Sequence, residues 1–499
     1  MSTAYQRMQE LMHTVTDLGA ASAVLGWDQE TYMPDGAVAG RAEQLATLST
    51  LIHRFSTNEA AQAIASEILA VKDTLTDEQQ RVAGVFAYDV QRATKLPADL
   101  VEESARVASF AQDAWKRARE ASDFSIFQPL LEKIVELKRR EADLLGTADH
   151  PYDNLIETYE QGMTVALLTP VFDELREGTK AILANIDPHQ ASVNDDVLYR
   201  SYPSDQQLAF AKDIVRTLGF DFNTGRVDLS AHPFCTNFGA SDVRLTTRIR
   251  ENDLRSCLFG LVHEAGHGMY EQGIGPSLWR TFAGQGASMG IHESQSLFWE
   301  NVVARSEEFW SWCFPKLRDA FPHQLGDQTP TSFFKAINCM KPSLNRVESD
   351  ELTYNLHIIL RFELERDLIA GAIEVRDVPE LWNQKMRDSL GVVPPNDREG
   401  CLQDVHWSFG GIGYFPSYTL GKLYAAMEWN AMQIEMPEVR NHIANGEFDG
   451  IRTWLRDRIH TCGRTERPNE ILQRVCGRSL TSTDFLEYVG AKAARVYGA

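Results

Sequence analysis

The sequence His263-Glu264-Ala265-Gly266-His267 places two imidazoles and a carboxylate in a stretch that we expect to be helical. Histidines at positions i and i+4 of a helix lie one above the other, so both side chains can reach a single ion. Glu264 is offset by one residue, which places it beside the ion without ligating it, in position to take a proton from the attacking water. The pattern is typical of a zinc-dependent metallopeptidase.

The helix that carries these residues is expected to span Leu254–Gly273. Asn252-Asp253 is a suitable cap before it, and the glycines at 273 and 275 with Pro276 end it. One apolar stripe contains Leu254, Leu258, Leu261 and Ala265. His263 lies about 200° around the helix from Leu261, so we expect the two histidines to face away from the core, toward a cleft.

A catalytic zinc site needs a third protein ligand and one open position. A third histidine six residues after the second, following a glycine, is one known solution, but Gly273 and Tyr270 occupy these two positions. A carboxylate from a following helix is the other solution. Glu293 fits it, because it lies near the start of an expected helix after a glycine-rich loop. Glu300, two turns further on the same face, is a candidate to support the ligands, and Glu271 is a weaker third-ligand candidate.

The composition restricts the class of protein and its partners. The chain has 499 residues, is 43% hydrophobic and carries a formal net charge of -21, which argues against binding to nucleic acid or anionic membrane surfaces. Its seven cysteines are widely spaced without a Cys-x-x-Cys pair, as expected for reduced thiols in the cytosol. No stretch approaches the roughly 20 apolar residues of a membrane span. We therefore expect a soluble, cytoplasmic protein.

Helical spacing of apolar residues dominates the chain. It runs from residue 1 to about 185 and resumes after the middle section, through Ala499. Between these parts, residues 242–250 alternate apolar and polar side chains, which predicts a strand. The expected fold class is mostly α with a small β-sheet.

Several motifs occur along the chain in a fixed order. They are Trp27-Asp28-Gln-Glu-Thr31-Tyr-Met33-Pro34, His232-Pro233-Phe234, Asp242-Val-Arg244-Leu-Thr246-Thr247, the pentapeptide at 263–267, His292-Glu293-Ser294-Gln295, Asn345-Arg346-Val-Glu-Ser349-Asp350 and Gly400-Cys-Leu-Gln403-Asp404-Val-His406-Trp407. With these motifs in this order, the chain resembles the carboxypeptidase Taq family of metallocarboxypeptidases, a glutamate-zincin family. The departures from the family pattern are Asn345 for Ile and Ser349 for Ala. Both flank Arg346 without replacing it.

The resemblance implies a large helical body in two lobes, with a long central active-site groove and the small sheet beside the zinc helix. It implies one catalytic domain over 1–499, with an N-terminal lobe of about 1–225 and a zinc-bearing lobe of about 226–499. It also implies a homodimer that removes single residues from the free C-termini of peptides, with broad preference. One Zn²⁺ is expected per subunit, although Co²⁺ or Mn²⁺ also suits two histidines and a glutamate.

The resemblance also implies roles for individual residues near the reacting bond. His263, His267 and Glu293 are the expected zinc ligands, and Glu264 is the expected general base. The tetrahedral oxyanion needs a further donor, for which His406 and Tyr418 are favoured, with Tyr414 close behind. Either tyrosine is equally well explained as a core aromatic residue.

Other residues are expected to bind the substrate. An exopeptidase must bind a terminal carboxylate, and the fork of Arg346 suits it, with help from Gln403. Arg361 is expected on a helix surface instead. Arg244 on the strand and His232 are candidates for substrate contact, although an architectural role explains both at least as well.

Two other functions remain open at this point. An endo-acting glutamate-zincin oligopeptidase would share the metal chemistry and differ in lacking recognition of the terminal carboxylate. A binding protein without turnover would use the groove alone.

Overall fold

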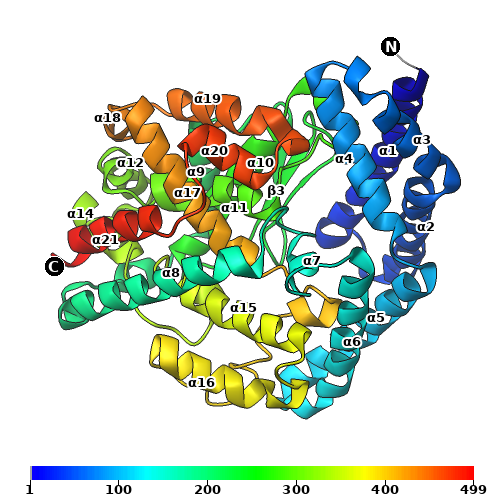
Figure 1. The fold of residues 1–499 in the computed structure, drawn as a ribbon. Coiled ribbons are helices and arrows are strands. Elements are labelled where there is room, and N and C mark those ends of the chain that lie inside the picture. Colours follow the sequence, from blue (N-terminus) through cyan, green and yellow to red (C-terminus); the bar gives the residue numbers. More distant parts are fainter. Residues whose placement is uncertain (1–2, 499) are drawn as a thin grey trace. The chain divides into compact units, whose positions relative to one another are not determined.

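The computed structural model describes residues 3–498, and Met1, Ser2 and Ala499 of the expected 1–499 domain lie outside the described residues. The fold is mostly helical with one small sheet, as expected (Figure 1). The chain divides into two compact units, each built from three stretches. Unit 1 comprises the chain up to Thr94, Asn194–Ile337 and Glu428–Arg478, and unit 2 comprises Lys95–Val193, Asn338–Met427 and the chain from Ser479. The boundary expected near residue 225 is not one of these crossing points and stays a prediction.

Unit 1 contains the sheet and most of the shorter helices. Its helices are α1 (Thr3–Thr31), α2 (Val38–Thr57), α3 (Glu59–Ala70), α4 (Asp77–Thr94), α9 (Ser204–Leu218), α10 (Leu254–Gly273), α11 (Met289–Leu297), α12 (Glu307–Ala320), α13 (Pro322–Leu325), α14 (Pro330–Ile337), α18 (Val439–Asn445), α19 (Asp449–Arg458) and α20 (Pro468–Cys476). Unit 2 contains α5 (Ala98–Ala121), α6 (Gln128–Leu145), α7 (Asp153–Ile156), α8 (Val165–Ile186), α15 (Tyr354–Ala370), α16 (Val378–Leu390) and α21 (Thr483–Tyr497). Helix α17 (Pro416–Glu435) passes from unit 2 into unit 1.

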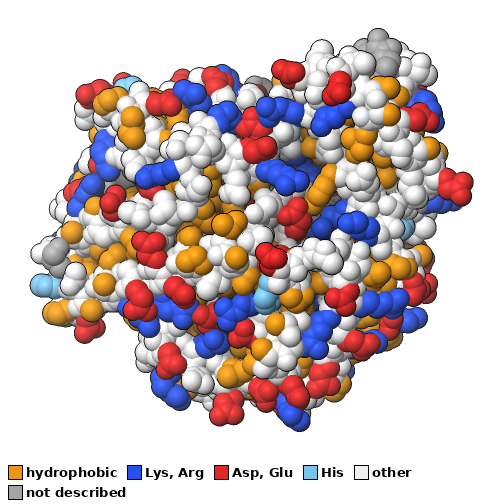
Figure 2. All heavy atoms as spheres, viewed as in Figure 1, with side chains coloured by type: hydrophobic (Ala, Val, Ile, Leu, Met, Phe, Trp, Pro, Cys, Tyr) orange, Lys and Arg blue, Asp and Glu red, His pale blue; other side chains and the backbone are white. Residues whose placement is uncertain are grey.

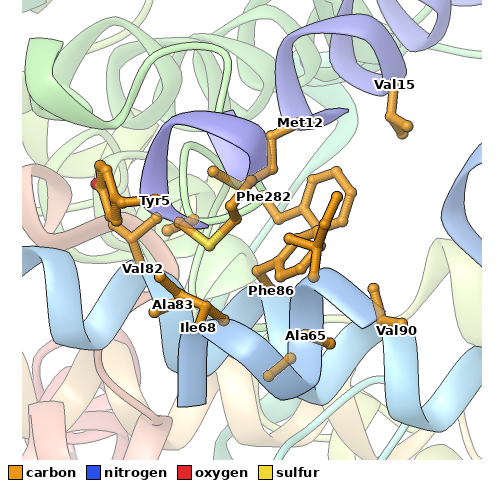
Figure 3. Packing of buried hydrophobic residues seen from close by; sticks show 14 of the residues in the cluster. Tyr5, Met12, Val15, Ala65, Ile68, Val82, Ala83, Phe86, Val90 and Phe282 are labelled. Carbon is orange, nitrogen blue, oxygen red and sulfur yellow. The ribbon is translucent and has the colours of Figure 1, made fainter. Parts of the chain in front are cut away.

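One hydrophobic core of unit 1 joins its first helices (Figure 3). Met8 and Met12 of α1, Ile68 of α3 and Phe86 of α4 are fully buried there, and Phe282, from the loop after α10, packs on Phe86. Burying one such large apolar side chain stabilises a fold by about 1.5–3 kcal/mol. This core therefore ties the N-terminal helices to the segment that leads into α11.

The sheet lies in unit 1 and has the strand order β1-β3-β2. Strand β3 (Val243–Thr247) confirms the strand predicted from alternation, and β1 (Gly225–Leu229) and β2 (Cys235–Asn237) flank it. β1 pairs with β3 in parallel and β2 pairs with it in antiparallel fashion. Thr246 breaks the alternation, because its buried hydroxyl accepts a hydrogen bond from the backbone N–H of Phe234.

The seven cysteines are all free thiols. Within residues 3–498, none of the helices combines the length and the apolar character needed to cross a bilayer. On the face viewed in Figure 2, Asp and Glu side chains are interspersed with Lys and Arg.

Candidate active site

Helix α10 begins and ends where the sequence predicts. The side chain of Asp253 caps it by accepting a hydrogen bond from the backbone N–H of Arg255, and the helix ends at Gly273. The apolar stripe is buried, whereas the side chains of His263 and His267 retain 22% and 16% exposure. The expected phase of the helix is therefore confirmed, with both imidazoles directed away from the apolar stripe.

Helix α11 lies against α10 because Gly266 leaves room for it. A Cβ atom at Gly266 would lie 2.5 Å from the carbonyl oxygen of Gln295 and 2.6 Å from the Cα of Ser296, closer than backbone atoms allow. Ser288 caps α11 by accepting a hydrogen bond from the N–H of Ile291. The close crossing brings Glu293, on the first turns of α11, to the two histidines.

The ligand atoms of His263, His267 and Glu293 all lie within 4.8 Å of one another. One carboxylate oxygen of Glu293 is 3.5 Å from Nε2 of His263 and 3.3 Å from Nε2 of His267. Burial lowers the pKa of His267 to about 4, which keeps its imidazole neutral and its lone pair free. Two imidazoles and one carboxylate at these separations fit a divalent metal ion with one open position.

The candidate ligand His263 contacts Glu300 on the side of its ring away from Glu293. Nδ1 of His263 lies 2.9 Å from Glu300, whose other oxygen accepts a hydrogen bond from Nη2 of Arg305 at 2.8 Å. Glu300 belongs to a π-helical turn, Phe298–Val303, that continues α11. Single π turns are often found at functional sites. Glu300 therefore contacts the imidazole of His263, as its expected position behind the candidate ligands requires.

The candidate ligand His267 contacts a second imidazole. Nδ1 of His267 lies 2.6 Å from Nδ1 of His292, and Nε2 of His292 lies 2.6 Å from Oε1 of Glu271. Glu271, the weaker third-ligand candidate, therefore bonds His292, and the cluster of possible ligands contains Glu293 in its place. The physical reason is that Glu271 lies one helical turn beyond His267 on α10, where its carboxylate contacts His292.

Glu264 is buried beside the cluster, with 7% of its surface exposed. Burial raises the pKa of Glu264 to about 7, and the nearby charge of Glu293 acts in the same direction. A carboxylate whose pKa lies near neutrality suits a general base.

The second face of α11 is fixed by a buried carboxylate. Glu428 accepts hydrogen bonds from the hydroxyl of Ser294 at 2.9 Å and from the side-chain amide of Gln295 at 3.1 Å. Oε1 of Gln295 also lies 2.9 Å from Nε2 of the buried His460. These contacts leave Glu293 little freedom to move with its helix.

The sheet residues predicted to contact substrate have different surroundings. The guanidinium of Arg244 stacks between Trp27 and Phe238, at 4.2 and 4.7 Å from the ring centres, and donates two hydrogen bonds to Asp242. These contacts favour the architectural role for Arg244. The side chain of His232 is exposed, and its backbone carbonyl accepts a hydrogen bond from Ser230.

Unit 2 brings the predicted carboxylate-binding residues together. Arg346 donates from Nε and Nη2 to Asp404 and from Nη1 to the hydroxyl of Tyr354. Gln403 accepts hydrogen bonds from the backbone N–H of Arg346 and from Nη2 of Arg361. Gln403 thus holds the backbone that carries Arg346.

The expectation that Arg361 lies on a helix surface is wrong. Its side chain is fully buried and donates to Asp404 at 2.7 Å from Nε. Helix α15 is buried on almost every face, so its apolar periodicity does not show which side is solvated. The carboxylate of Asp404 therefore binds both Arg346 and Arg361. The three residues are far apart in the sequence, so their spacing did not predict these ion pairs.

The residues that depart from the family pattern form a polar turn beside Arg346. The side chain of Asn345 accepts a hydrogen bond from the N–H of Val347, and the hydroxyl of Ser349 donates to the carbonyl of Asn345. Arg346 keeps its bonds to Asp404 in this setting. The departures therefore leave the arginine in place.

His406, Tyr414 and Tyr418 also lie together in unit 2. Nε2 of His406 is 3.1 Å from the hydroxyl of Tyr418, and the ring centres of His406 and Tyr414 are 5.4 Å apart. Burial lowers the pKa of His406 to about 4, with help from the charges of Arg346 and Arg361. The imidazole is neutral near pH 7. All three side chains are half-buried, so neither tyrosine is a fully buried core residue.

Two imidazoles on one helix, a glutamate on the following helix and a buried glutamate beside them define a metallopeptidase site for a divalent ion. Residues 7–493 match the family model described as carboxypeptidase Taq (M32) metallopeptidase. The chain therefore belongs to this family and is a metallocarboxypeptidase, a hydrolase of peptides.

Similar proteins cover almost the whole chain. "Carboxypeptidase 1" of Bacillus subtilis is 37% identical over 98% of this chain and 97% of its own. "Thermostable carboxypeptidase 1" of Thermus thermophilus is 39% identical over 99% of each chain. The crystal structure of the M32 carboxypeptidase from Deinococcus radiodurans has a TM-score of 0.96 at 38% identity and covers 100% of both chains. These names favour the carboxypeptidase over the oligopeptidase alternative.

The sequence did not indicate the contacts that His292 and Asp404 make in the structure, or the burial of Glu365. His292 was within a recognised motif but had no role, and Asp404 was likewise only a motif position. Glu365, a fully buried carboxylate on α15, carried no motif at all. Its spacing of four residues from Arg361 was the one available signal.

Proposed function

We propose that this protein is a zinc-dependent carboxypeptidase that removes single residues from the free C-termini of peptides, with broad preference. The observation that carries the proposal is the set of three ligand atoms from His263, His267 and Glu293 within 4.8 Å. Two imidazoles and a carboxylate suit Zn²⁺, and also accept Co²⁺ or Mn²⁺. One ion per subunit is proposed, because these residues form one cluster.

The proposed chemistry assigns proton transfer to Glu264. When bound, the ion polarises the scissile carbonyl and lowers the pKa of the attacking water. Glu264 takes a proton from that water and passes it to the leaving amine, which its pKa of about 7 favours. Glu300 and His292 keep the ring orientations of His263 and His267 fixed meanwhile.

The proposed recognition of the peptide terminus rests on Arg346. Its hydrogen bonds to Asp404 and Tyr354 use three of its five N–H groups, leaving one on each terminal nitrogen. Those two donors suit a carboxylate. Gln403 is assigned to orienting Arg346 rather than to the substrate.

The proposed donors to the oxyanion are His406 and Tyr418, with Tyr414 as the alternative tyrosine. A neutral His406 supplies a ring N–H without carrying a charge. Substrate contact by His232 and Arg244 stays a prediction, and the stacking of Arg244 supports an architectural role instead.

The proposed setting is a cytoplasmic homodimer. The seven free cysteines support a reducing compartment, and the family resemblance supports the dimer. Sedimentation of the purified protein measures the second point directly.

The test of the mechanism is Glu264→Gln. Without a base, kcat is expected to fall about 10²–10⁴-fold while the metal content is unchanged, because Glu264 does not bind the ion. The control is Glu251→Gln, an exposed position before the same helix. Full activity of the Glu264 variant would show that another group is the base, and absence of metal or turnover in the parent protein would favour the binding-protein alternative.

The test of exopeptidase action compares one peptide with a free and with an amidated C-terminus. Stepwise release of single residues from the free acid and no cleavage of the amide are expected. Cleavage of internal bonds in the amide would instead identify an oligopeptidase.

A further inference from the structure

The segment that carries His406 and Tyr414 is rich in glycine. Gly410, Gly411 and Gly413 lie between the two residues. Gly413 has a φ of 96°, and a Cβ atom there would lie 2.8 Å from the backbone carbonyl of Leu155. Glycines lose more backbone entropy on ordering than other residues. A segment of this composition therefore needs strong contacts from outside to place its two ends.

Glu365 of α15 supplies such contacts on both sides of the glycines. Its Oε1 accepts a hydrogen bond from the indole N–H of Trp407 at 2.7 Å, and its Oε2 accepts one from the backbone N–H of Gly413 at 2.9 Å. The hydroxyl of Tyr152 donates to the same Oε2. The carboxylate is fully buried, so water does not compete for these bonds.

The bonded positions are the immediate neighbours of His406, a proposed oxyanion donor, and of Tyr414, the alternative tyrosine. Trp407 follows His406, and Gly413 precedes Tyr414. One turn earlier on α15, Arg361 holds Asp404 and Gln403 at the start of the same segment. One face of α15 thus fixes the segment at its start and on either side of its glycines.

We propose that Glu365 is a positioning residue for the peptidase reaction, and that it acts by holding His406 and Tyr414 through Trp407 and Gly413. The inference rests on the proposed function of His406 as oxyanion donor, with Tyr414 as the alternative tyrosine. Glu365 itself does not touch substrate in this role.

Glu365→Gln tests the proposal because an amide cannot replace both oxygens. Trp407 Nε1 and the backbone nitrogen of Gly413 are donors only. Whichever way the amide is turned, its NH₂ group faces one of these N–H groups, and one end of the segment is released. The hydroxyl of Tyr152, by contrast, can rotate to accept.

We expect Glu365→Gln to lower kcat about 100-fold, the effect of a displacement of about 1 Å near reacting atoms, with KM and metal content within twofold. The ring ¹⁵N resonances of His406 should shift. The matched control is Glu363→Gln, on the same helix, which removes ion pairs to Arg176 and Lys385 and no bond to the segment. It should retain kcat within twofold. Unchanged kcat in folded Glu365→Gln would overturn the proposal.

If Glu365→Gln does not fold, two variants that each remove one hydrogen-bond donor to Glu365 test the proposal instead. Trp407→Phe removes the bond beside His406, and Tyr152→Phe removes the bond outside the segment. A fall in kcat of about tenfold or more in the first, with less than a threefold change in the second, supports positioning. Equal effects of the two variants would contradict it.

Testing Glu365→Gln in a chain that lacks the His406 and Tyr414 side-chain groups separates this inference from the proposed function. In a chain that carries His406→Ala and Tyr414→Phe, adding Glu365→Gln should change kcat less than twofold, because the groups through which it acts are gone. The same loss as in the wild-type background would refute action through these residues. If the background substitutions alone leave kcat unchanged, the proposed catalytic role of His406 fails and Tyr414 is excluded as the alternative tyrosine, whereas a shift of the His406 resonances by Glu365→Gln in the wild-type background still supports positioning.

Discussion

The two histidines of the candidate metal cluster are supported in different ways. His263 contacts the carboxylate of Glu300, which is itself paired with Arg305. His267 contacts the imidazole of His292, whose other ring nitrogen lies within hydrogen-bond distance of Glu271. If His267 bound an ion through Nε2, its ring proton would lie on Nδ1, so His267 would donate to Nδ1 of His292 and His292 would donate to Glu271.

At the residue scale, His292→Ala should weaken metal binding. The substitution removes the acceptor that fixes the tautomer and ring orientation of His267, and we expect affinity to fall about 10–100-fold. Competition with a chelator measures the change independently of activity. His189→Ala, an exposed histidine, serves as the control. Unaltered affinity in His292→Ala would show that His267 needs no such partner.

At the scale of the elements, the sequence predicted what local rules determine. The limits of α10, its cap at Asp253 and strand β3 follow from periodicity and capping, and a helix start near Glu293 follows from the glycine-rich loop before it. Strands β1 and β2 were not predicted, since they are short and paired through non-local contacts with β3. The burial of Arg361 was also missed, because a helix enclosed on all sides has no polar face to identify.

The crossing of α10 and α11 depends on the glycine within the metal-binding motif. Gly266→Ala should destabilise the protein by about 1–3 kcal/mol and weaken metal binding, because the new methyl group meets backbone atoms of α11 that cannot rotate away. Denaturant unfolding and chelator competition measure the two effects.

Gly260→Ala on the same helix is the matched control, since its Cβ would lie 3.8 Å from the nearest atom, the hydroxyl of Thr247. It should be neutral or slightly stabilising, as expected from helix propensity. If both substitutions behaved alike, the close approach at Gly266 would not be what sets the crossing.

At the scale of the whole molecule, stability should decline in acid because of buried neutral histidines. Burial, with the charges of Arg361 and Arg346, lowers the pKa of His357 from 6.5 to about 3, although Asp404 opposes this. Between these values the unfolded chain binds a proton that the folded chain does not. The stabilisation is thus complete above pH 6.5 and is lost as the pH falls toward 3.

Between pH 6.5 and 3, this histidine makes the free energy of unfolding fall by about 1.4 kcal/mol for each unit that the pH drops. In His357→Gln the free energy of unfolding should therefore fall less steeply with pH, by that amount. Denaturant titrations of the metal-free protein at pH 7 and pH 5 measure it, and removing the metal keeps ligand protonation out of the comparison. Equal pH slopes for the variant and the parent would show that His357 is protonated in the folded state.

The division of the chain into two units has a consequence for synthesis on the ribosome. The chain alternates between the units through six stretches, and unit 1 is complete only at Arg478, while unit 2 includes the last helix. Neither unit can close while a large part of the chain is still to be made. The helices up to Thr94 emerge long before α19 and α20 of the same unit. A nascent chain of this protein thus exposes unfinished apolar surfaces for most of its translation time, the condition under which incomplete chains aggregate.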